Sequence, residues 1–174
     1  MISLMPRFLL LLALFALLSP LRASDPTELK EARAAYEKSA TPTEAQREQY
    51  IAQLAHLRDH LVKSNRVPDA FAVDAEVMKH PAPSDPATAK TLAHLILGKW
   101  RSPRHDYLFR KDGTWTMLPV EEDGAANTNG EWQIKGNQFD DSDGSPYTIL
   151  LLDADNFIYT DGKYVFYEKR LKDK

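Results

Sequence analysis

The spacing of apolar residues divides the chain into two parts. In the first part, Leu54, Leu57 and Leu61 follow one another at intervals of three and four, with polar residues on the other helical faces. From residue 97 onward the pattern changes to short alternating segments, separated by Asp-Gly and Asn-Gly pairs. Alternation places every second side chain on one face of a strand, and such pairs favour tight hairpins. We therefore predict an α+β chain, with helices first and an antiparallel β-domain second.

Residues 24–80 predict a helical hairpin or three-helix segment. The second helix has the clearest start, because Thr41 is followed by Glu44 at the spacing of a capping box and Pro42 takes the first helical position. The apolar stripes are narrow, so the segment by itself buries little surface. We expect it to dock on the β-domain or to pair with another chain. Residues 81–96, a proline-rich linker and a short helix, lead into the β-domain.

Residues 97–174 predict a β-meander or a small barrel of seven to eight strands, since turn residues separate short apolar runs along this whole region. The expected strands lie near 97–102, 106–111, 114–119, 129–135, 137–140, 147–152, 156–160 and 163–170. The last of them are apolar on both faces. We expect one face to be covered by the barrel interior or by the docked helices.

Three motifs of this region occur in a recognisable order. They are Gly98-Lys99-Trp100, then Phe109-Arg-Lys-Asp-Gly-Thr114, then Gly130-Glu-Trp-Gln-Ile134. This order resembles the lipocalin-like domains of secreted bacterial proteins. The resemblance implies that the first tryptophan packs at the closed end of a barrel against a basic residue of the last strand. Here that pair would be Trp100 with Lys169 or Arg170. The helices from Tyr50 to Glu76 resemble segments that precede such domains, which implies a spacer or assembly role.

Residues 1–23 have the pattern of a secretory signal peptide. Arg7 provides the positive charge, residues 8–18 form an apolar core, and Ser19-Pro20 precedes a small residue, Ala23. A core of this length spans about 16 Å, roughly half of a hydrocarbon layer, so we do not expect a membrane anchor. We predict cleavage near Ala23, export to the periplasm or the outside of the cell, and no membrane association afterwards.

The charge and composition exclude several classes of function. The formal charge is −3, and it falls to about −5 without Arg7 and Arg22. An acidic protein lacks the basic surface that binding to phosphate backbones requires, so we expect no nucleic-acid partner. The absence of cysteine excludes disulfides, thiolate metal sites and a cysteine nucleophile. We expect no cofactor.

Two motifs have partial metal-ligand spacing. His56 and His60 lie four residues apart on a helix, but the glutamate of a metalloprotease helix and a third ligand are missing. Asp141 and Asp143 precede Gly144 as in a calcium loop, but the later glutamate is replaced by Leu150. We interpret the first as a solvated helix face and the second as a hairpin loop, and we expect no metal site.

The three tryptophans are the remaining candidates for ligand contact. Trp100, Trp115 and Trp132 could line a pocket or a carbohydrate-stacking surface, although core packing is the favoured explanation because large aromatic side chains dominate small cores. We expect Trp115 to be the most exposed of the three. No motif for a catalytic nucleophile or phosphate loop is present, so we expect no catalytic residues.

Three functions remain open. The first is an exported, non-enzymatic structural or binding module for an apolar small molecule, a glycan or a protein partner. The second is an assembly protein that forms homo-oligomers through its helices. The third is an enzyme with an unfamiliar site in the mouth of the β-domain.

Overall fold

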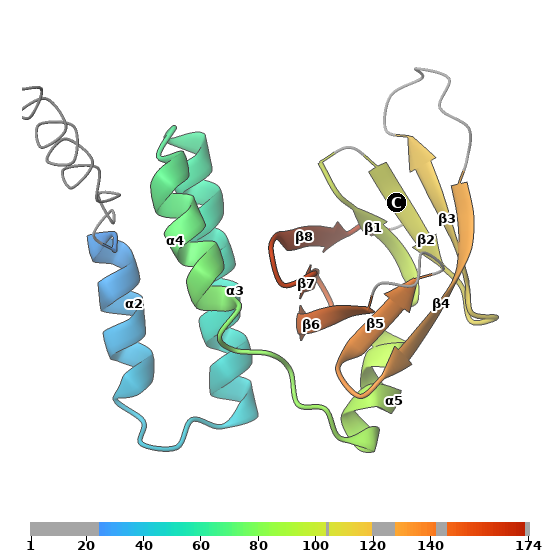
Figure 1. Ribbon diagram of the computed structural model, residues 1–174, viewed down its shortest axis with the longest axis horizontal. Coiled ribbons are helices and arrows are strands. Elements are labelled where there is room, and N and C mark those ends of the chain that lie inside the picture. The colour runs from blue at the N-terminus through green and yellow to red at the C-terminus, as the bar shows by residue number, and fades with distance from the viewer. Residues whose placement is uncertain (1–24, 104, 120–127, 142–145, 173–174) are drawn as a thin grey trace, which may run out of the picture.

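The computed structural model describes residues 25–103, 105–119, 128–141 and 146–172 (Figure 1). The predicted signal peptide, residues 1–23, lies outside the described part of the chain. Within that part, no helix is long and apolar enough to cross a membrane.

In the described part of the chain four helices precede the strands, which confirms the helical half of the predicted fold class. They are α2 (Thr27–Glu37), α3 (Glu44–Lys63), α4 (Val67–Val77) and α5 (Pro86–Leu95). The predicted capping box of α3 is wrong in position. Thr43 is the N-cap, its hydroxyl accepts from the backbone N–H of Gln46, and the Gln46 side chain accepts from the backbone N–H of Thr43. Thr43 and Gln46 have the same spacing as Thr41 and Glu44, so spacing alone could not choose between them.

Eight strands follow and close into an antiparallel barrel in which each strand pairs with its sequence neighbours. They are β1 (Gly98–Arg101), β2 (His105–Phe109), β3 (Thr114–Pro119), β4 (Thr128–Lys135), β5 (Gln138–Asp141), β6 (Pro146–Leu152), β7 (Asn156–Thr160) and β8 (Val165–Arg170). Pairing of β1 with β8 completes the ring. The predicted α+β fold with a small lipocalin-like barrel is therefore confirmed.

A bulge in β6 explains why its sequence is apolar at consecutive positions. The register with β7 shifts between Ile149 and Leu151. As a result Ile149 and Leu152 belong to the core inside the barrel, while Leu150 and Leu151 belong to the core under the helices. An extra residue in one strand changes which face the following side chains take. Both faces of β6 are thus buried, one by each core.

The helices α3 and α4 pack against the outer face of the last strands on one side of the barrel, and α2 packs against them on the side away from the strands (Figure 1). Their shared core contains Leu54, Leu61 and Val73 from the helices together with Ile158 and Val165 from β7 and β8. This arrangement covers the narrow helical stripes without a second chain. The expectation that the helices dock on the β-domain is confirmed.

Arg47 of α3 hydrogen-bonds to the bulge in β6. Its side chain is 9% exposed, and its Nη1 donates to the carbonyl oxygens of Leu150 at 2.6 Å and His80 at 2.9 Å. The bulge leaves Leu150 without a register partner on β7, so this carbonyl is available to the helix. The guanidinium also pairs with Glu44, one helical turn away. A single buried cation therefore joins the helical segment to the sheet.

The end of the barrel near α5 is closed. Leu92 and Ile96 enter the interior core there, and Trp100 is fully buried with its Nε1 donating to the Ile96 carbonyl at 2.7 Å. The guanidinium carbon of Arg170 lies 4.1 Å from the centroid of the Trp100 ring. Gly98 has φ of +114°, and a Cβ there would lie 3.0 Å from Arg170 Nη1. The glycine of the Gly-x-Trp motif is thus needed for both its backbone angle and the approach of the arginine.

Candidate functional site

The interior of the barrel contains a cavity of about 260 Å³ at the end away from Trp100, which we call the mouth cavity. Its wall is mostly aromatic and includes two carboxyl side chains. The lining residues are Tyr107, Phe109, Trp115, Met117, Thr128, Phe139, Asp141, Tyr147, Tyr159, Phe166 and Glu168. A concave space with aromatic walls and a few polar groups is the usual form of a small-molecule site.

Strand alternation builds this wall. Tyr107 and Phe109, two residues apart on β2, stack at a centroid distance of 6.2 Å. Tyr159 stacks on Phe166 at 5.0 Å, and the edge of Tyr147 contacts Tyr159 at 5.3 Å. Inward positions carry aromatic rings on β2, β3, β5, β6, β7 and β8, so rings make up most of the cavity wall.

Glu168 is the main polar group of the cavity. The residue is 2% exposed, and its Oε1 accepts a hydrogen bond from the Tyr159 hydroxyl at 2.7 Å. Its Oε2 is buried and has no hydrogen-bond partner among the described residues. Burial raises the pKa of Glu168 to about 7, although the bond from Tyr159 acts in the opposite direction. The carboxyl group therefore changes its charge near neutral pH.

A second hollow, of about 590 Å³, adjoins the mouth cavity and shares Tyr107, Tyr159, Phe166 and Glu168 with it. It lies where β1 is too short to accompany β8, since the two strands are paired only through two residues each. Basic residues occur in this side hollow, and each of three has a partner. Arg101 pairs with Asp106, Arg58 pairs with Asp74, and Lys169 donates to Asn156. Glu168 is therefore part of the lining of both hollows.

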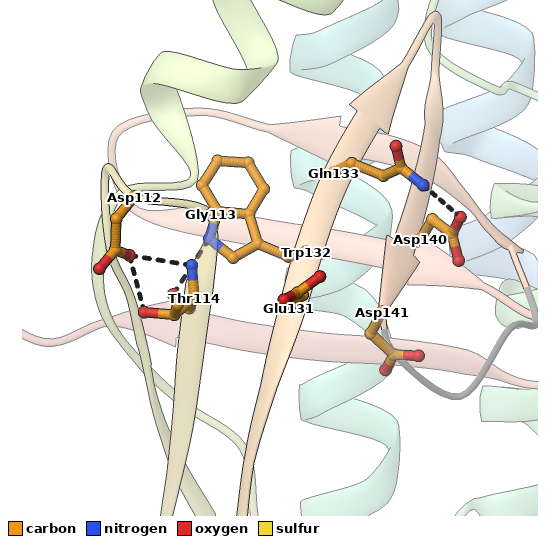
Figure 2. Close-up of a pocket in the computed structure, with 8 residues that line it drawn as sticks. All are labelled: Asp112, Gly113, Thr114, Glu131, Trp132, Gln133, Asp140 and Asp141. Atoms are coloured by element: carbon orange, nitrogen blue, oxygen red, sulfur yellow. Dashed lines mark hydrogen bonds between the residues drawn. The ribbon is translucent and has the colours of Figure 1, made fainter.

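A third hollow, of about 610 Å³, lies on the outside of the barrel around the β2–β3 turn, β4 and β5 (Figure 2). Its polar groups are largely satisfied. Asp112 accepts from the backbone and the hydroxyl of Thr114, and Gln133 donates to Asp140. Groups that already have partners are poorly placed to hold a ligand, so we regard the smaller mouth cavity as the candidate site.

The three tryptophans occupy different places. Trp100 is at the closed end, Trp115 is 7% exposed and lines the mouth cavity, and Trp132 is half-buried and lines the outer hollow. The Trp132 Nε1 donates to the carbonyls of Arg110 and Thr114 (the latter in Figure 2). The structure therefore brings only one of them to the mouth cavity. The expectation that Trp115 is the most exposed is wrong, because closure of the barrel turns its face of β3 inward.

Of the other motifs, only Asp141 of the possible calcium loop is among the described residues that line the mouth cavity. His56 and His60 are on exposed positions of α3, as expected for a solvated face. Asp143 and Gly144 of the possible calcium loop lie outside the described residues. Within residues 25–103, 105–119, 128–141 and 146–172, no group of three or more histidine or acidic residues could hold a metal ion.

Sequence reasoning missed Glu168, although a signal for it was present. Phe166, Glu168 and Arg170 alternate along β8, so they share one face. Once Arg170 is chosen over Lys169 as the partner of Trp100, that face must be the interior, and a glutamate must be buried there. Whether Lys169 or Arg170 contacts Trp100 thus determines whether Glu168 faces the cavity or the solvent.

Comparisons of the chain with family models, with curated proteins and with solved structures found no match. The inference of function therefore depends on the geometry of the mouth cavity.

Proposed function

We propose that the protein is an exported, non-enzymatic binding protein that holds a small molecule in the mouth cavity of its barrel. One observation carries this proposal: an aromatic cavity of about 260 Å³ contains a buried carboxyl oxygen with no partner among the described residues. A buried acceptor without a hydrogen bond costs free energy, and a ligand that donates to it would remove that cost. Such a group is therefore better explained by binding than by stability.

The size of the cavity limits the ligand. At about 30 Å³ for each water molecule, 260 Å³ corresponds to roughly nine waters. A ligand of about ten non-hydrogen atoms with one ring fits this space. An intact glycan chain or a long lipid does not fit within it.

The test is a titration of the unliganded protein with compact ring compounds such as 2-phenylethanol, followed by calorimetry. Met117→Trp fills the cavity, and Leu118→Trp adds the same ring at the next position of β3, on the opposite face. We expect binding to the unmodified protein and to Leu118→Trp, and at least a tenfold loss in Met117→Trp. Equal binding by all three proteins, or by none of them, would refute the proposal.

Catalysis is a second candidate, because a carboxyl group with a pKa of about 7 suits a general acid or base. His105 lines the adjoining side hollow, and its Nδ1 is buried without a partner among the described residues. NMR spectra of a bound ligand distinguish the two functions. We expect the ligand to remain unchanged over hours, whereas steady conversion that requires Glu168 would identify an enzyme.

Export is the part of the proposal that depends on residues 1–23, through the charged start and apolar core of that segment. Mass spectrometry of the protein recovered outside the cytoplasm should give an N-terminus at Ser24. An intact N-terminus beginning at Met1 would contradict this prediction.

A further inference from the structure

Among the described residues, no cation neutralises the carboxyl group of Glu168 in the mouth cavity. In the described part of the chain Glu168 forms no ion pair, and its one hydrogen bond comes from the neutral hydroxyl of Tyr159. The Oε2 atom has no partner there. A buried carboxylate is strongly stabilised by a hydrogen-bonded cation, so the site has the chemistry of one half of an ion pair.

The walls around this carboxyl group are suited to a positive charge. Ring side chains from five strands surround the space: Tyr107, Trp115, Tyr147, Tyr159 and Phe166. The faces of aromatic rings carry negative potential and attract ammonium groups, an effect that grows when water is excluded. A neutral ligand with a hydroxyl group can also contact the rings and donate one hydrogen bond to the carboxylate, but only a cation adds charge attraction to both.

The charges of the cavity also favour a cation over an anion. Its described lining includes the carboxyl groups of Glu168 and Asp141 and no lysine, arginine or histidine. Arg170, the next inward residue of β8, lies over Trp100 and donates to the carbonyls of Leu95, Leu97 and Ala154. It is therefore occupied at the closed end. An anionic ligand would meet the carboxyl group of Glu168 and no basic side chain among the described lining residues.

We propose that the ligand of the mouth cavity is a small organic ammonium ion, which donates N–H hydrogen bonds to Glu168 Oε2 and lies against the surrounding ring faces. This inference rests on the proposed binding function and specifies the class of ligand. A primary or secondary amine attached to a single ring satisfies both the acceptor and the aromatic wall.

The charge of Glu168 makes such binding depend on pH. The groups that face it are Tyr107 from β2, Tyr159 from β7 and, across the cavity, Asp141 from β5, with Arg170 on its own strand and His105 in the side hollow. Burial raises the pKa values of both tyrosines, so their hydroxyls stay neutral between pH 5 and 9. Because the pKa of Glu168 is about 7, the carboxylate that pairs with an ammonium ion disappears as the pH falls below 7.

The experiment compares three compounds of similar size on the full mature protein: 2-phenylethylamine, 2-phenylethanol and phenylacetate. Their dissociation constants are measured by calorimetry at pH 8.5 and pH 5.5, a range in which the amine remains protonated. We expect the amine to bind at least tenfold more tightly than the alcohol at pH 8.5. If only the ionised carboxyl group binds the amine, the affinity for the amine falls by about 30-fold between pH 8.5 and pH 5.5, while the affinity for the alcohol stays constant.

Two variants identify the group responsible. Glu168→Gln keeps the shape but cannot become charged, so the amine should lose at least tenfold in affinity at pH 8.5 together with its pH dependence. Glu131→Gln makes the same change at an exposed position of β4 and should leave all constants unchanged.

The outcomes separate the two proposals. Equal affinities for the amine and the alcohol, or an amine affinity that does not change with pH, would overturn the ammonium inference and leave the binding function intact. If none of the three compounds binds, both proposals fail. The pH comparison uses the unmodified protein, so it decides the question even if Glu168→Gln does not fold.

Discussion

The guanidinium group of Arg170 covers the ring of Trp100, with 4.1 Å between its central carbon and the ring centroid. The two residues are directly paired across β8 and β1, so their contact joins the first and last strands of the barrel. The same guanidinium donates to carbonyls of Leu95 and Leu97, just before β1, and of Ala154 in the β6–β7 turn. One side chain thus holds together three separate segments at the closed end.

Arg170→Met is therefore expected to destabilise the barrel. The substitution retains much of the apolar stem but leaves three carbonyls without this donor and removes the cation–π contact, for a loss of about 2–4 kcal/mol. Urea unfolding monitored by tryptophan fluorescence measures it. Lys169→Met, at the exposed neighbouring position, should cost less than about 1 kcal/mol. Equal effects of both variants would show that Arg170 does not close the barrel.

Glu168 is expected to lower the stability of the unliganded protein above neutral pH. Its pKa is about 7 in the folded state and near 4.5 in an unfolded chain, so the folded state binds the extra proton between these values. Stability from this group therefore falls as the pH rises from 4.5 to 7, by about 3 kcal/mol in total.

Glu168→Gln should remove the loss of stability that occurs as the pH rises from 4.5 to 7. The variant and the unmodified protein should differ little at pH 4.5, and the variant should be more stable by about 3 kcal/mol at pH 8.5. Urea unfolding at the two pH values measures the difference. A variant that is equally destabilised at both would show that the carboxyl group contributes to stability instead of binding.

Glu76, in the helical segment, contributes to stability with the opposite pH dependence to that of Glu168. It is 3% exposed, and burial alone would raise its pKa, but hydrogen bonds from Arg33, Lys79 and His80 outweigh burial and lower the pKa to about 2. The folded pKa lies below the unfolded one, so the stabilisation is complete above pH 4.5 and is lost as the pH falls towards 2. Glu76→Gln should cost about 3 kcal/mol at pH 7 and much less at pH 2.5.

The control for Glu76 is Glu37→Gln, on an exposed position of α2. It should change the unfolding free energy by less than about 0.5 kcal/mol at either pH. A pH-independent loss in Glu76→Gln would indicate that packing, and not the ion-pair network, is responsible.

Arg47→Met tests how the helices are attached to the barrel. The variant leaves the carbonyls of Leu150 and His80 without their buried donor, which should cost about 2–4 kcal/mol. Hydrogen exchange of α3 should accelerate more than that of β2 and β3 on the far side. Lys63→Met, an exposed change on the same helix, should leave both measurements unaffected.

The strands were largely predictable from the sequence because alternation and turn residues act locally. β3 and β7 have the predicted bounds, and the other six differ by at most two residues at either end. The bulge at Leu150 could not be predicted in the same way, since a run of apolar residues fits either face. Its position depends on the helices that cover it and on Arg47, more than a hundred residues away in the sequence.

The candidate site was harder to predict than the fold. In the sequence, Trp100, Trp115 and Trp132 are all tryptophans in predicted strands, and nothing there distinguishes their roles. Those roles depend on where each side chain lies in the closed barrel. Glu168 lies among charged residues at the end of the chain, where a solvated side chain is the ordinary interpretation. Its burial follows only from the register that pairs Trp100 with Arg170.

The central claim, that the mouth cavity holds a small molecule, is tested most directly by methyl NMR of the mature protein. The sequence has four methionines, and two of them, Met1 and Met5, lie in the predicted signal peptide. Met117 lines the cavity, while Met78 packs against the helical core and serves as an internal control. On titration with 2-phenylethylamine at pH 8.5, we expect a saturable shift of the Met117 methyl signal and a constant Met78 signal. A Met117 signal that stays unchanged at saturating ligand would contradict the claim.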